Sequence, residues 1–555
     1  MTFVDLQSRN DLADFLRIPR ARLAYILYIL NTENLYQGFD IAKKSGGVRH
    51  IDAPQEPLKS VQRSLAKALY EYRKTVLGKD KLYVSQAYEK GHSIITNASI
   101  HKNKRFVLNL DISDFFGSFH FGRVLGFFEK NKYFRLPHEV AIVIAQLSCF
   151  QGHLPQGSPC SPVITNLISQ IMDFRLLKIT KHYKVDYTRY ADDLTFSTND
   201  KHFLANKVAF LKDISREVQR SGFLLNESKY RLSYRDSRQR VTGLVVNQGV
   251  GVKKEFRKDT RAMANNLYTK GFYMMNGATG TLNQLEGRFA FIDQLDRIHH
   301  QQAVKLGNKI PSFNTREKQY QKFLVYKYFY ANPKPLIATE GKTDIIYIEA
   351  ALKNLYREYP ELISKDEQGF HLKISFLKRN AHMEYFLKIK KDGADPLKNI
   401  YEFYKKDINS LLPDYMNSFV KKSGKEPSTP VMLLFDNESH SDKPLHNFLS
   451  AEKINLQSQL KSHVFLRHNL FLLAIPLQNG RHESEIEDLF DQKLLNYKIN
   501  GKSFKRKDND STKYYGKAVF ANYVLHHYQQ INFSKFRPLL DDIKSVVVSD
   551  LAKLS

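Results

Sequence analysis

The chain has 555 residues and carries 85 Lys and Arg against 57 Asp and Glu, a formal charge of +28 at pH 7. This length exceeds one compact domain, and 42% hydrophobic residues exclude wholesale disorder. A cationic surplus of this size favours a polyanionic partner, with simple solubility as the plain alternative.

The sequence argues against a membrane-spanning protein and against a disulfide-rich protein. No stretch approaches the roughly 20 apolar residues that span a bilayer, and residues 1–20 lack the apolar core of a signal peptide. Cys149 and Cys160 form no CxxC pair, which fits a reducing compartment and excludes a cysteine zinc site. We therefore expect a cytoplasmic protein without a membrane partner.

Residues 1–100 read as helices interrupted by a short basic strand pair within 43–54, and residues 104–250 mix strands with helices. An apolar strand at 106–110 ends at Asp111. A rigid Gly- and Pro-containing loop at 154–162 holds Gln156 and Gly157, before an apolar helix at 163–177. Gln156 can hydrogen-bond a base or an incoming nucleotide, and Gly157 permits close backbone approach.

The segment Tyr190-Ala-Asp-Asp193 lies between two strand patterns, which predicts a β-hairpin with both aspartates at its tip. Because Asp favours turns, a plain hairpin is the alternative. Adjacent aspartates beside a buried strand are costly unless a cation neutralises them. With Asp111 they predict a three-carboxylate cage for two Mg²⁺ ions, the chemistry of nucleotidyl transfer.

In this order and spacing, the three segments resemble motifs A, B and C of the reverse transcriptase family. The resemblance implies an RNA-directed DNA polymerase with an α+β right-hand fold of fingers, palm and helical thumb. It makes Asp111, Asp192 and Asp193 the catalytic metal ligands. It also makes Phe116 the steric gate that selects deoxynucleoside triphosphates, with a core phenylalanine as the alternative.

Two lesser matches extend the resemblance. Residues 45–54 are similar to the family's fingers strands, which makes Arg49 a candidate for binding the incoming triphosphate. Residues 222–229 are similar to motif D, which makes Lys229 a candidate for the pyrophosphate. A solvated side chain is the alternative for both.

Two short strings look like signatures of bacterial retron reverse transcriptases. They supply the RNA-binding candidates Asn97, His101, Val241, Thr242 and Gly243, although a capped or buried histidine is the alternative for His101. The retron resemblance implies a cognate structured non-coding RNA, copied into a branched RNA–DNA product (msDNA) from the 2′-OH of a guanosine. A reverse transcriptase of another bacterial branch is the alternative.

Residues 253–332 read as a basic helical thumb and linker, after fingers and palm at 1–252. Between 253 and 330 there are 14 Lys and Arg against 6 Asp and Glu, which suits a duplex backbone. Surface solvation is the alternative for each of the candidate cations, which are Lys253, Lys254, Arg257, Lys258, Arg261 and Arg288.

Two prolines within 331–335 mark a boundary. Beyond it, apolar strands at 336–338, 431–435 and 464–477 alternate with helices such as 343–359, and 421–430 reads as an exposed loop. This alternation predicts an α/β domain with a mostly parallel sheet. Gly341-Lys-Thr343 is not a P-loop, because Leu336 stands where a glycine is required.

Two acidic segments follow strands of this domain. Glu340 ends the strand at 336–338, and Asp436-Asn-Glu438 ends the strand at 431–435. Carboxylates at neighbouring parallel strand ends make a metal site at the rim of the sheet.

Residues 333–555 thereby resemble the TOPRIM domain of overcoming-lysogenization-defect nucleases. The resemblance implies a site for one or two Mg²⁺ ions, with Glu340 catalytic and Glu438 replacing the usual second aspartate. The implied ligands are Glu340, Asp344, Asp436 and Glu438. A later acidic element is similar at Glu485, Glu487 and Asp488, and a trailing base at Lys517. A helix N-terminus and a solvated lysine are the alternatives.

The fusion implies a nuclease that acts on a nucleic-acid target as an effector in antiphage defence. A non-catalytic nucleic-acid-binding or assembly module is the alternative for this domain. RNA and DNA remain open as targets, and so does a homo-oligomer.

Overall fold

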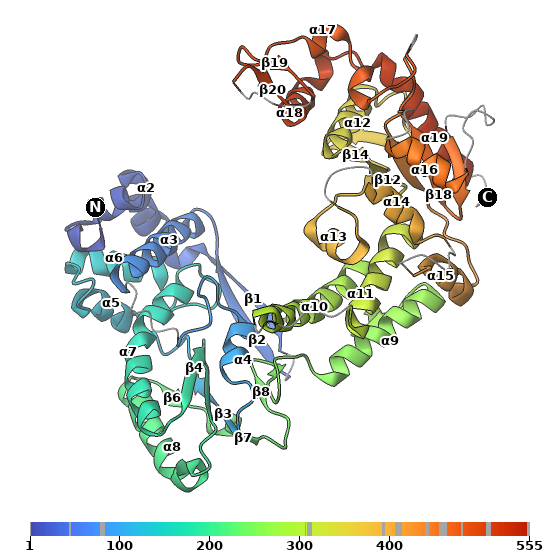
Figure 1. The fold of residues 1–555 in the computed structure, drawn as a ribbon. Coiled ribbons are helices and arrows are strands. Elements are labelled where there is room, and N and C mark those ends of the chain that lie inside the picture. Colours follow the sequence, from blue (N-terminus) through green and yellow to red (C-terminus); the bar gives the residue numbers. More distant parts are fainter. Residues whose placement is uncertain are drawn as a thin grey trace. The chain divides into compact units, whose positions relative to one another are not determined.

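The computed structural model has two compact units, Met1–Lys254 and Glu255–Ser555, each described here by itself (Figure 1). Within its described ranges, no helix is both long and apolar enough to cross a bilayer. The described residues are 2–43, 46–77, 84–305, 307, 313–390, 395–405, 413–438, 443–453, 463–478, 481–506 and 512–551.

The first unit is built on a five-stranded antiparallel sheet in the order β4-β5-β3-β6, with β7 also paired to β3. Side chains alternate across a strand, and Leu108, Leu110 and Ile112 of β3 pack into the hydrophobic core. Asp111 therefore faces the opposite side. The strands are β3 (Phe106–Ser113), β4 (Asp186–Tyr190), β5 (Asp193–Thr198), β6 (Leu224–Leu225) and β7 (Arg231–Tyr234).

Helices cover the core face of this sheet. The apolar residues of α7 and α8 join those of β3 and β5 in one cluster. The helices of this unit are α1 (Arg9–Phe15), α2 (Arg20–Ala24), α3 (Leu58–Leu77), α4 (Ile94–Ile100), α5 (Phe121–Lys130), α6 (His138–Ser148), α7 (Ser161–His182) and α8 (Phe203–Arg220), with short helices η1 (Phe3–Asp5), η2 (Tyr25–Asn31), η3 (Thr32–Leu35) and η4 (Glu227–Lys229).

Two hairpins complete the unit. The predicted basic strand pair is a hairpin of β1 (Tyr36–Ala42) and β2 (Val48–Pro54) that begins earlier than expected; Lys44 and Ser45 lie outside the described residues. The second hairpin joins β8 (Arg240–Val241) to β9 (Leu244–Val245).

The second unit holds a five-stranded sheet in the order β15-β12-β16-β18-β17. The first four strands are parallel and β17 is antiparallel. Their apolar residues alternate between two cores, one on each face of the sheet. The strands are β12 (Leu336–Thr339), β15 (Ser375–Phe376), β16 (Val431–Phe435), β17 (His463–Arg467) and β18 (Leu470–Ala474).

One face of this sheet packs against α12, α18 and α19, and the other packs against the basic helices and α13 to α16. The helices are α9 (Lys254–Lys270), α10 (Leu282–Lys305), α11 (Thr315–Val325), η5 (Tyr326–Tyr330), α12 (Lys342–Asn354), α13 (Ala381–Leu387), α14 (Asp395–Glu402), α15 (Tyr415–Ser423), α16 (Pro444–Glu452), η6 (Ile486–Leu489), α17 (Gln492–Leu495), α18 (Lys517–His527), η7 (Tyr528–Gln530), η8 (Ser534–Phe536) and α19 (Arg537–Leu551).

Small strand pairs lie outside the main sheet. They are β10 (Met274–Met275) with β11 (Ala278–Thr279), β13 (Ile363–Asp366) with β14 (Gly369–Leu372), and β19 (Ser503–Phe504) with β20 (Tyr514–Tyr515).

Three expectations change. The division at 332/333 falls inside one compact unit, because α9 to α11 share a core with the sheet. The apolar run at 464–477 is two antiparallel strands, β17 and β18, because the chain turns at His468, whose φ is 53°. The expected loop at 421–430 begins only after α15, which ends where Gly424 adopts a left-handed φ of 68°.

Candidate catalytic sites

The candidate polymerase carboxylates lie on adjacent strands. Asp111 of β3 is the direct cross-strand partner of Asp193 at the start of β5, and such partners have Cβ atoms about 5 Å apart. Asp192 occupies the turn between β4 and β5, and its carbonyl accepts a 3.0 Å hydrogen bond from the amide of Ile112. Asp111 is thereby brought to Asp192 and Asp193, which lie 81 and 82 positions further along the chain.

The electrostatics agree with this convergence. Burial, and then the charges of Asp192 and Asp111, raise the pKa of Asp193 to about 6, even though the residue keeps an open face to solvent. Burial also raises the pKa of Asp192, with Asp111 adding to the rise and Lys229 and Arg49 opposing it. A cation beside these carboxylates would relieve their mutual repulsion.

Lys229 supplies such a cation in this structure. Its Nζ donates to both oxygens of Asp111 at 2.8 and 2.9 Å, and these hydrogen bonds raise the pKa of the lysine. The resemblance to motif D predicts that Lys229 binds the pyrophosphate. In this structure Lys229 instead pairs with Asp111, which is a predicted metal ligand.

Two of the predicted nucleotide-binding residues, Gln156 and Gly157, contact β2. The amide of Asp52 on β2 donates to the carbonyl of Gln156 at 2.9 Å. Gly157 has a φ of +139°, and a Cβ there would lie 2.4 Å from the carbonyl oxygen of Asp52. The close backbone approach predicted for Gly157 is thus to β2.

Arg49 and Phe116 differ in exposure. Arg49 is exposed and lies near enough to Asp192 to lower its pKa. Phe116 is half-buried, with its ring 5.5 Å from that of Phe115 in an edge arrangement. The steric-gate role of Phe116 stays a prediction.

A buried arginine behind the turn was not predicted. Arg189 is 0% exposed and binds Asp173 of α7 in a forked geometry, with Nε–Oδ1 at 3.0 Å and Nη2–Oδ2 at 2.8 Å. Its Nη1 also donates to the carbonyl of Ala191 inside the turn at 3.3 Å. An arginine within a predicted strand was the available signal, because a buried guanidinium requires a partner.

A second acidic cluster lies where β12 and β16 end in the C-terminal unit. β12 and β16 are adjacent parallel strands, so Glu340 and Asp436 leave the sheet at the same rim. The amide of Asp436 donates to Oε1 of Glu340 at 3.2 Å. Oδ1 of Asp436 accepts from the amide of Ile486, also at 3.2 Å.

The other predicted ligands of this cluster have partners. Asp344 accepts from the amide of Gly341 at 2.8 Å and so caps α12. Glu438 pairs with Lys443 at 2.6 Å. Lys517 lies 3.4 Å from Glu485 and 3.0 Å from Glu487, which is fully buried. Asp488 instead pairs with Arg481 and Arg506, both at 2.5 Å.

Crowded carboxylates raise one another's pKa values here. Burial, then Glu340 and Asp344, raise the pKa of Asp436 to about 9. Burial, then Glu438 and Asp344, raise that of Glu340 to about 7. The pKa of Asp344 is raised to about 6, first by burial and then by the charge of Glu487.

Among the described residues, no group of three or more His, Cys, Asp or Glu side chains has its donors arranged around one metal position. In both clusters several oxygens already bind lysines or backbone amides. The donor chemistry of hard carboxylate oxygens nevertheless suits Mg²⁺.

Comparison with known proteins gives a family match for the first unit. Residues 41–257 match the family model for reverse transcriptase (RNA-dependent DNA polymerase). The matched range includes the strands and the turn that carry Asp111, Asp192 and Asp193. The family model ends near the start of α9. It therefore assigns no activity to the C-terminal unit.

Three curated proteins that are similar to this chain are retron reverse transcriptases. The chain is 29% identical over 320 residues to the Retron Ec86 reverse transcriptase of Escherichia coli, covering 56% of this chain and 91% of that protein. It is 36% identical over 246 residues to the Mx65 enzyme of Myxococcus xanthus, covering 41% and 55%. The N-terminal part of the chain is thus similar to retron reverse transcriptases.

A third relative, the Retron Mx162 reverse transcriptase of Myxococcus xanthus, is 31% identical over 325 residues, covering 53% of this chain and 64% of that protein. A solved telomerase from Candida albicans gives a TM-score of 0.31 at 11% identity, covering 59% of this chain and 65% of that one. That structural likeness is too weak to carry an argument.

The hairpin that carries the second retron-like string contacts α4, the helix that carries most of the first. Thr242 donates to the carbonyl of Ile94 at the start of α4, at 3.2 Å. Thr242 and Gly243, with φ of 45° and 85°, form the two-residue turn between β8 and β9, and the glycine suits a left-handed position there.

The side chains of Asn97, His101 and Val241 are all 0% exposed, and the RNA-binding role of these residues stays a prediction. His101 lies 2.7 Å from both Ser197 and Thr188. Thr188 donates to Asn97 at 2.5 Å, so Nε2 of His101 donates to Thr188 and Nδ1 accepts from Ser197. Burial lowers the pKa of His101 to about 3, so the ring is neutral.

The basic helix α9 presents four cations on one exposed face, since positions three, four and seven apart lie together. Arg288 differs from these, because its guanidinium lies 3.9 Å from the ring of Phe256 and donates to Thr260. It links α10 to α9, and its role in binding a nucleic-acid backbone stays a prediction. The exposed cations are Lys254, Arg257, Lys258 and Arg261, and Lys253 beside them is half-buried.

Proposed function

We propose that this retron-type reverse transcriptase copies a cognate structured RNA into branched msDNA, primed from a guanosine 2′-OH. The cross-strand pairing of Asp111 with Asp193, with Asp192 in the adjoining turn, is the observation that carries the assignment of its catalytic centre. The names of its curated relatives support the retron substrate.

The three aspartates would hold two Mg²⁺ ions. Bound there, the ions would lower the pKa of the attacking hydroxyl and stabilise the leaving pyrophosphate. Lys229 would leave Asp111 as the metal binds and become available to the phosphates of the deoxynucleoside triphosphate. Arg49 would bind the triphosphate and Phe116 would exclude a ribose 2′-OH.

The test uses the full chain expressed with its own RNA. Asp192→Asn with Asp193→Asn removes two charged ligands and should abolish cDNA that copurifies with the protein. Asp236→Asn, which changes an exposed aspartate of the same unit, is the matched control. Undiminished cDNA from the double variant would refute the assignment. Sequencing should find a 2′,5′ branch at guanosine, and a free 3′ primer end would indicate another bacterial branch.

For the C-terminal unit we propose a TOPRIM-type, Mg²⁺-dependent nuclease that acts as an antiphage effector. The convergence of Glu340, Asp436 and Glu487 at the rim of a mostly parallel sheet supports it. Glu340 is assigned the acid–base role because its pKa of about 7 suits proton transfer at neutral pH. One or two Mg²⁺ ions would share Glu340, Asp344, Asp436 and Glu438.

Cleavage of labelled RNA and DNA by the full chain tests this second activity. Glu340→Gln should remove both Mg²⁺-dependent cleavage and protection of cells against phage. Glu367→Gln, an exposed glutamate of the same unit, should retain both. If Glu340→Gln cleaves and protects like the control, the unit is better described as a non-catalytic binding or assembly module.

A further inference from the structure

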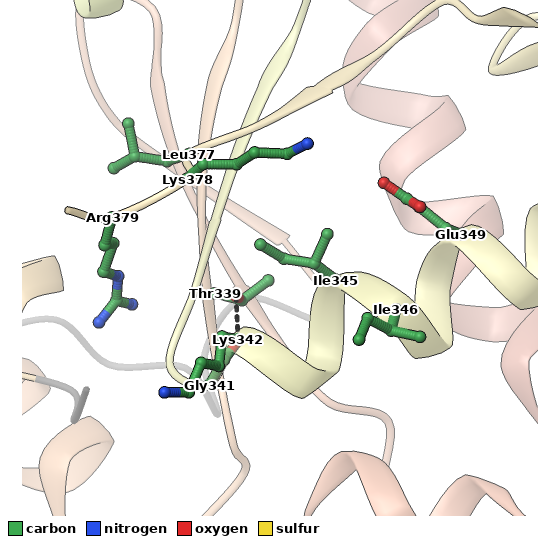
Figure 2. A pocket seen from close by; sticks show the side chains of 9 residues that line it. All are labelled: Thr339, Gly341, Lys342, Ile345, Ile346, Glu349, Leu377, Lys378 and Arg379. Carbon is green, nitrogen blue, oxygen red and sulfur yellow. Dashed lines mark hydrogen bonds between the residues drawn. The ribbon is translucent and has the colours of Figure 1, made fainter. Parts of the chain in front are cut away.

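A cavity of about 330 Å³ opens beside the turn between β12 and α12 (Figure 2). This volume lies in the range of small-ligand sites, about 300–1,000 Å³. Basic and apolar side chains line it together, namely Lys342, Lys378 and Arg379 with Ile345, Ile346 and Leu377. Such a lining suits a ligand that joins an anionic group to an apolar or flat body.

The charges are distributed unevenly around the cavity. In Figure 2, the nitrogen tips of Lys342 and Arg379 lie at the left, while Lys378 extends to the right above Ile345, on the side of Glu349. A phosphate would find two cations at one end, and the aliphatic side chains between the two ends would contact a base or sugar.

This cavity shares its turn with the acidic cluster. Thr339 and Gly341 line it, and the residue between them is Glu340. Arg379 lies near enough to Glu340 and Asp344 to lower the pKa of both. Since the amide of Gly341 already donates to Asp344 at 2.8 Å, the cationic side chains and not the helix end supply the positive charge.

We propose that this cavity seats one nucleotide unit of the nucleic acid on which the acidic cluster acts. Its phosphate would lie on Lys342 and Arg379, and its base or sugar against Ile345 and Leu377. The assignment rests on the proposed nuclease function and names its substrate: a phosphorylated nucleotide, supplied either by a strand or as a free mononucleotide.

Binding without metal tests the cavity apart from cleavage. The full-length complex in EDTA is titrated with a short fluorescent oligonucleotide bearing a 5′-phosphate, and fluorescence anisotropy is measured. Lys342→Glu with Lys378→Glu should weaken binding about tenfold, since two exposed cations become anions. Both side chains are exposed, so folding should persist.

The matched control is Lys421→Glu with Lys425→Glu, an equal charge change at exposed positions of the same unit. Both double variants keep the polymerase unit unchanged, so their difference isolates the cavity. Equal affinity of the two variants for the oligonucleotide would overturn the proposal. Adenosine monophosphate distinguishes the two sources of the nucleotide. If it displaces the oligonucleotide from the cavity, the cavity binds a free nucleotide. If the oligonucleotide stays bound in a cavity-dependent way, the cavity binds a strand.

The nuclease proposal fails separately. If Glu340→Gln still cleaves while the cavity variant loses binding, the cavity assignment stands and the catalytic assignment falls. If cleavage requires Glu340 but the cavity variant binds like its control, only the cavity assignment is wrong.

Discussion

Arg189 lies directly before the turn that carries Asp192 and Asp193, and its guanidinium is fully buried against Asp173. The same guanidinium donates to the carbonyl of Ala191, a residue with a left-handed φ of 57°. A side chain outside the predicted metal cage therefore supports the unusual backbone of the catalytic turn. We regard Arg189 as a positioning residue for the polymerase.

Replacing Arg189 by Met should lower the free energy of unfolding by about 3–5 kcal/mol, because the buried carboxylate of Asp173 loses its cation and keeps only the hydrogen bond from Tyr187. Urea unfolding of the full chain measures this loss. Adding Asp173→Leu should recover most of the stability, yet cDNA synthesis should stay low because the carbonyl of Ala191 still lacks its donor. Full recovery of synthesis in the double variant would show that Arg189 serves stability alone.

The carboxyl group of Asp436 has the most displaced pKa of the second cluster, about 9. Since this value is above that of an aspartate in the unfolded chain, about 4, the folded state retains a proton that the unfolded state releases. The contribution to stability is thus present below about pH 4 and is lost as the pH rises toward 9. Metal-free protein should melt at progressively lower temperature over that interval.

Asp436→Asn should flatten this pH dependence, because the amide keeps the acceptor for Ile486 without the ionisable group. Melting temperatures in EDTA at pH 5 and pH 9 provide the measurement, with Asp366→Asn on the exposed hairpin as control. Parallel pH profiles for wild type and Asp436→Asn would contradict the prediction. Mg²⁺ should raise the melting temperature of the wild type more at pH 9 than at pH 6.

At the scale of elements, α9 combines two tasks. Its inner side joins the core through Ala264, Leu267 and Tyr268, and its outer side presents four exposed cations within its first two turns. A helix built this way can bind a nucleic-acid backbone without disturbing its own packing.

Changing Lys254, Arg257, Lys258 and Arg261 to Gln should weaken RNA binding uniformly across sequences. Each lost phosphate contact should reduce the slope of log K against log salt by roughly 0.7–0.9. Binding of the cognate RNA at several salt concentrations measures the slope. As a control, four exposed lysines elsewhere in the unit are changed to Gln, which gives an equal charge change; these are Lys398, Lys421, Lys425 and Lys493. If the α9 variant keeps the slope of the wild type, α9 does not bind the backbone.

At the scale of the whole chain, the hydrophobic cores divide the protein at a different place from the sequence motifs. Tyr268, Phe289 and Phe323 from the basic helices pack in one cluster with Leu336 and Phe419 from the α/β part. The basic helices are thus part of the structural unit that carries the acidic cluster, although the polymerase resemblance assigns them to a thumb.

A fragment that begins at residue 255 should fold and melt cooperatively, whereas one that begins at residue 333 should not. The shorter fragment would expose the apolar surface that α9 to α11 cover, which favours aggregation. Thermal melting and binding of a hydrophobic dye compare the two fragments. A cooperative transition for residues 333–555 alone would show that the sheet does not depend on the basic helices.

The local patterns of the sequence predicted strands at 106–110, 336–338 and 431–435 and a hairpin with its tip at 190–193, and the structure contains each of them. β3 continues to Ser113, so Asp111 lies within that strand and not at its end. Strand periodicity and turn chemistry are encoded within a few residues, so short strings suffice to predict them. The resemblance to reverse transcriptases rests on such strings and agrees with the family match over residues 41–257.

Only the tertiary structure decided which of these groups are buried and what they bind. It closed His101 and Asn97 inside the palm, brought Lys229 onto Asp111 across 118 positions, and turned residues 463–474 into a hairpin. It also merged the basic helices with the second domain. Burial and ion pairing depend on atoms contributed by distant parts of the chain, and no local pattern of residues records which distant parts will meet.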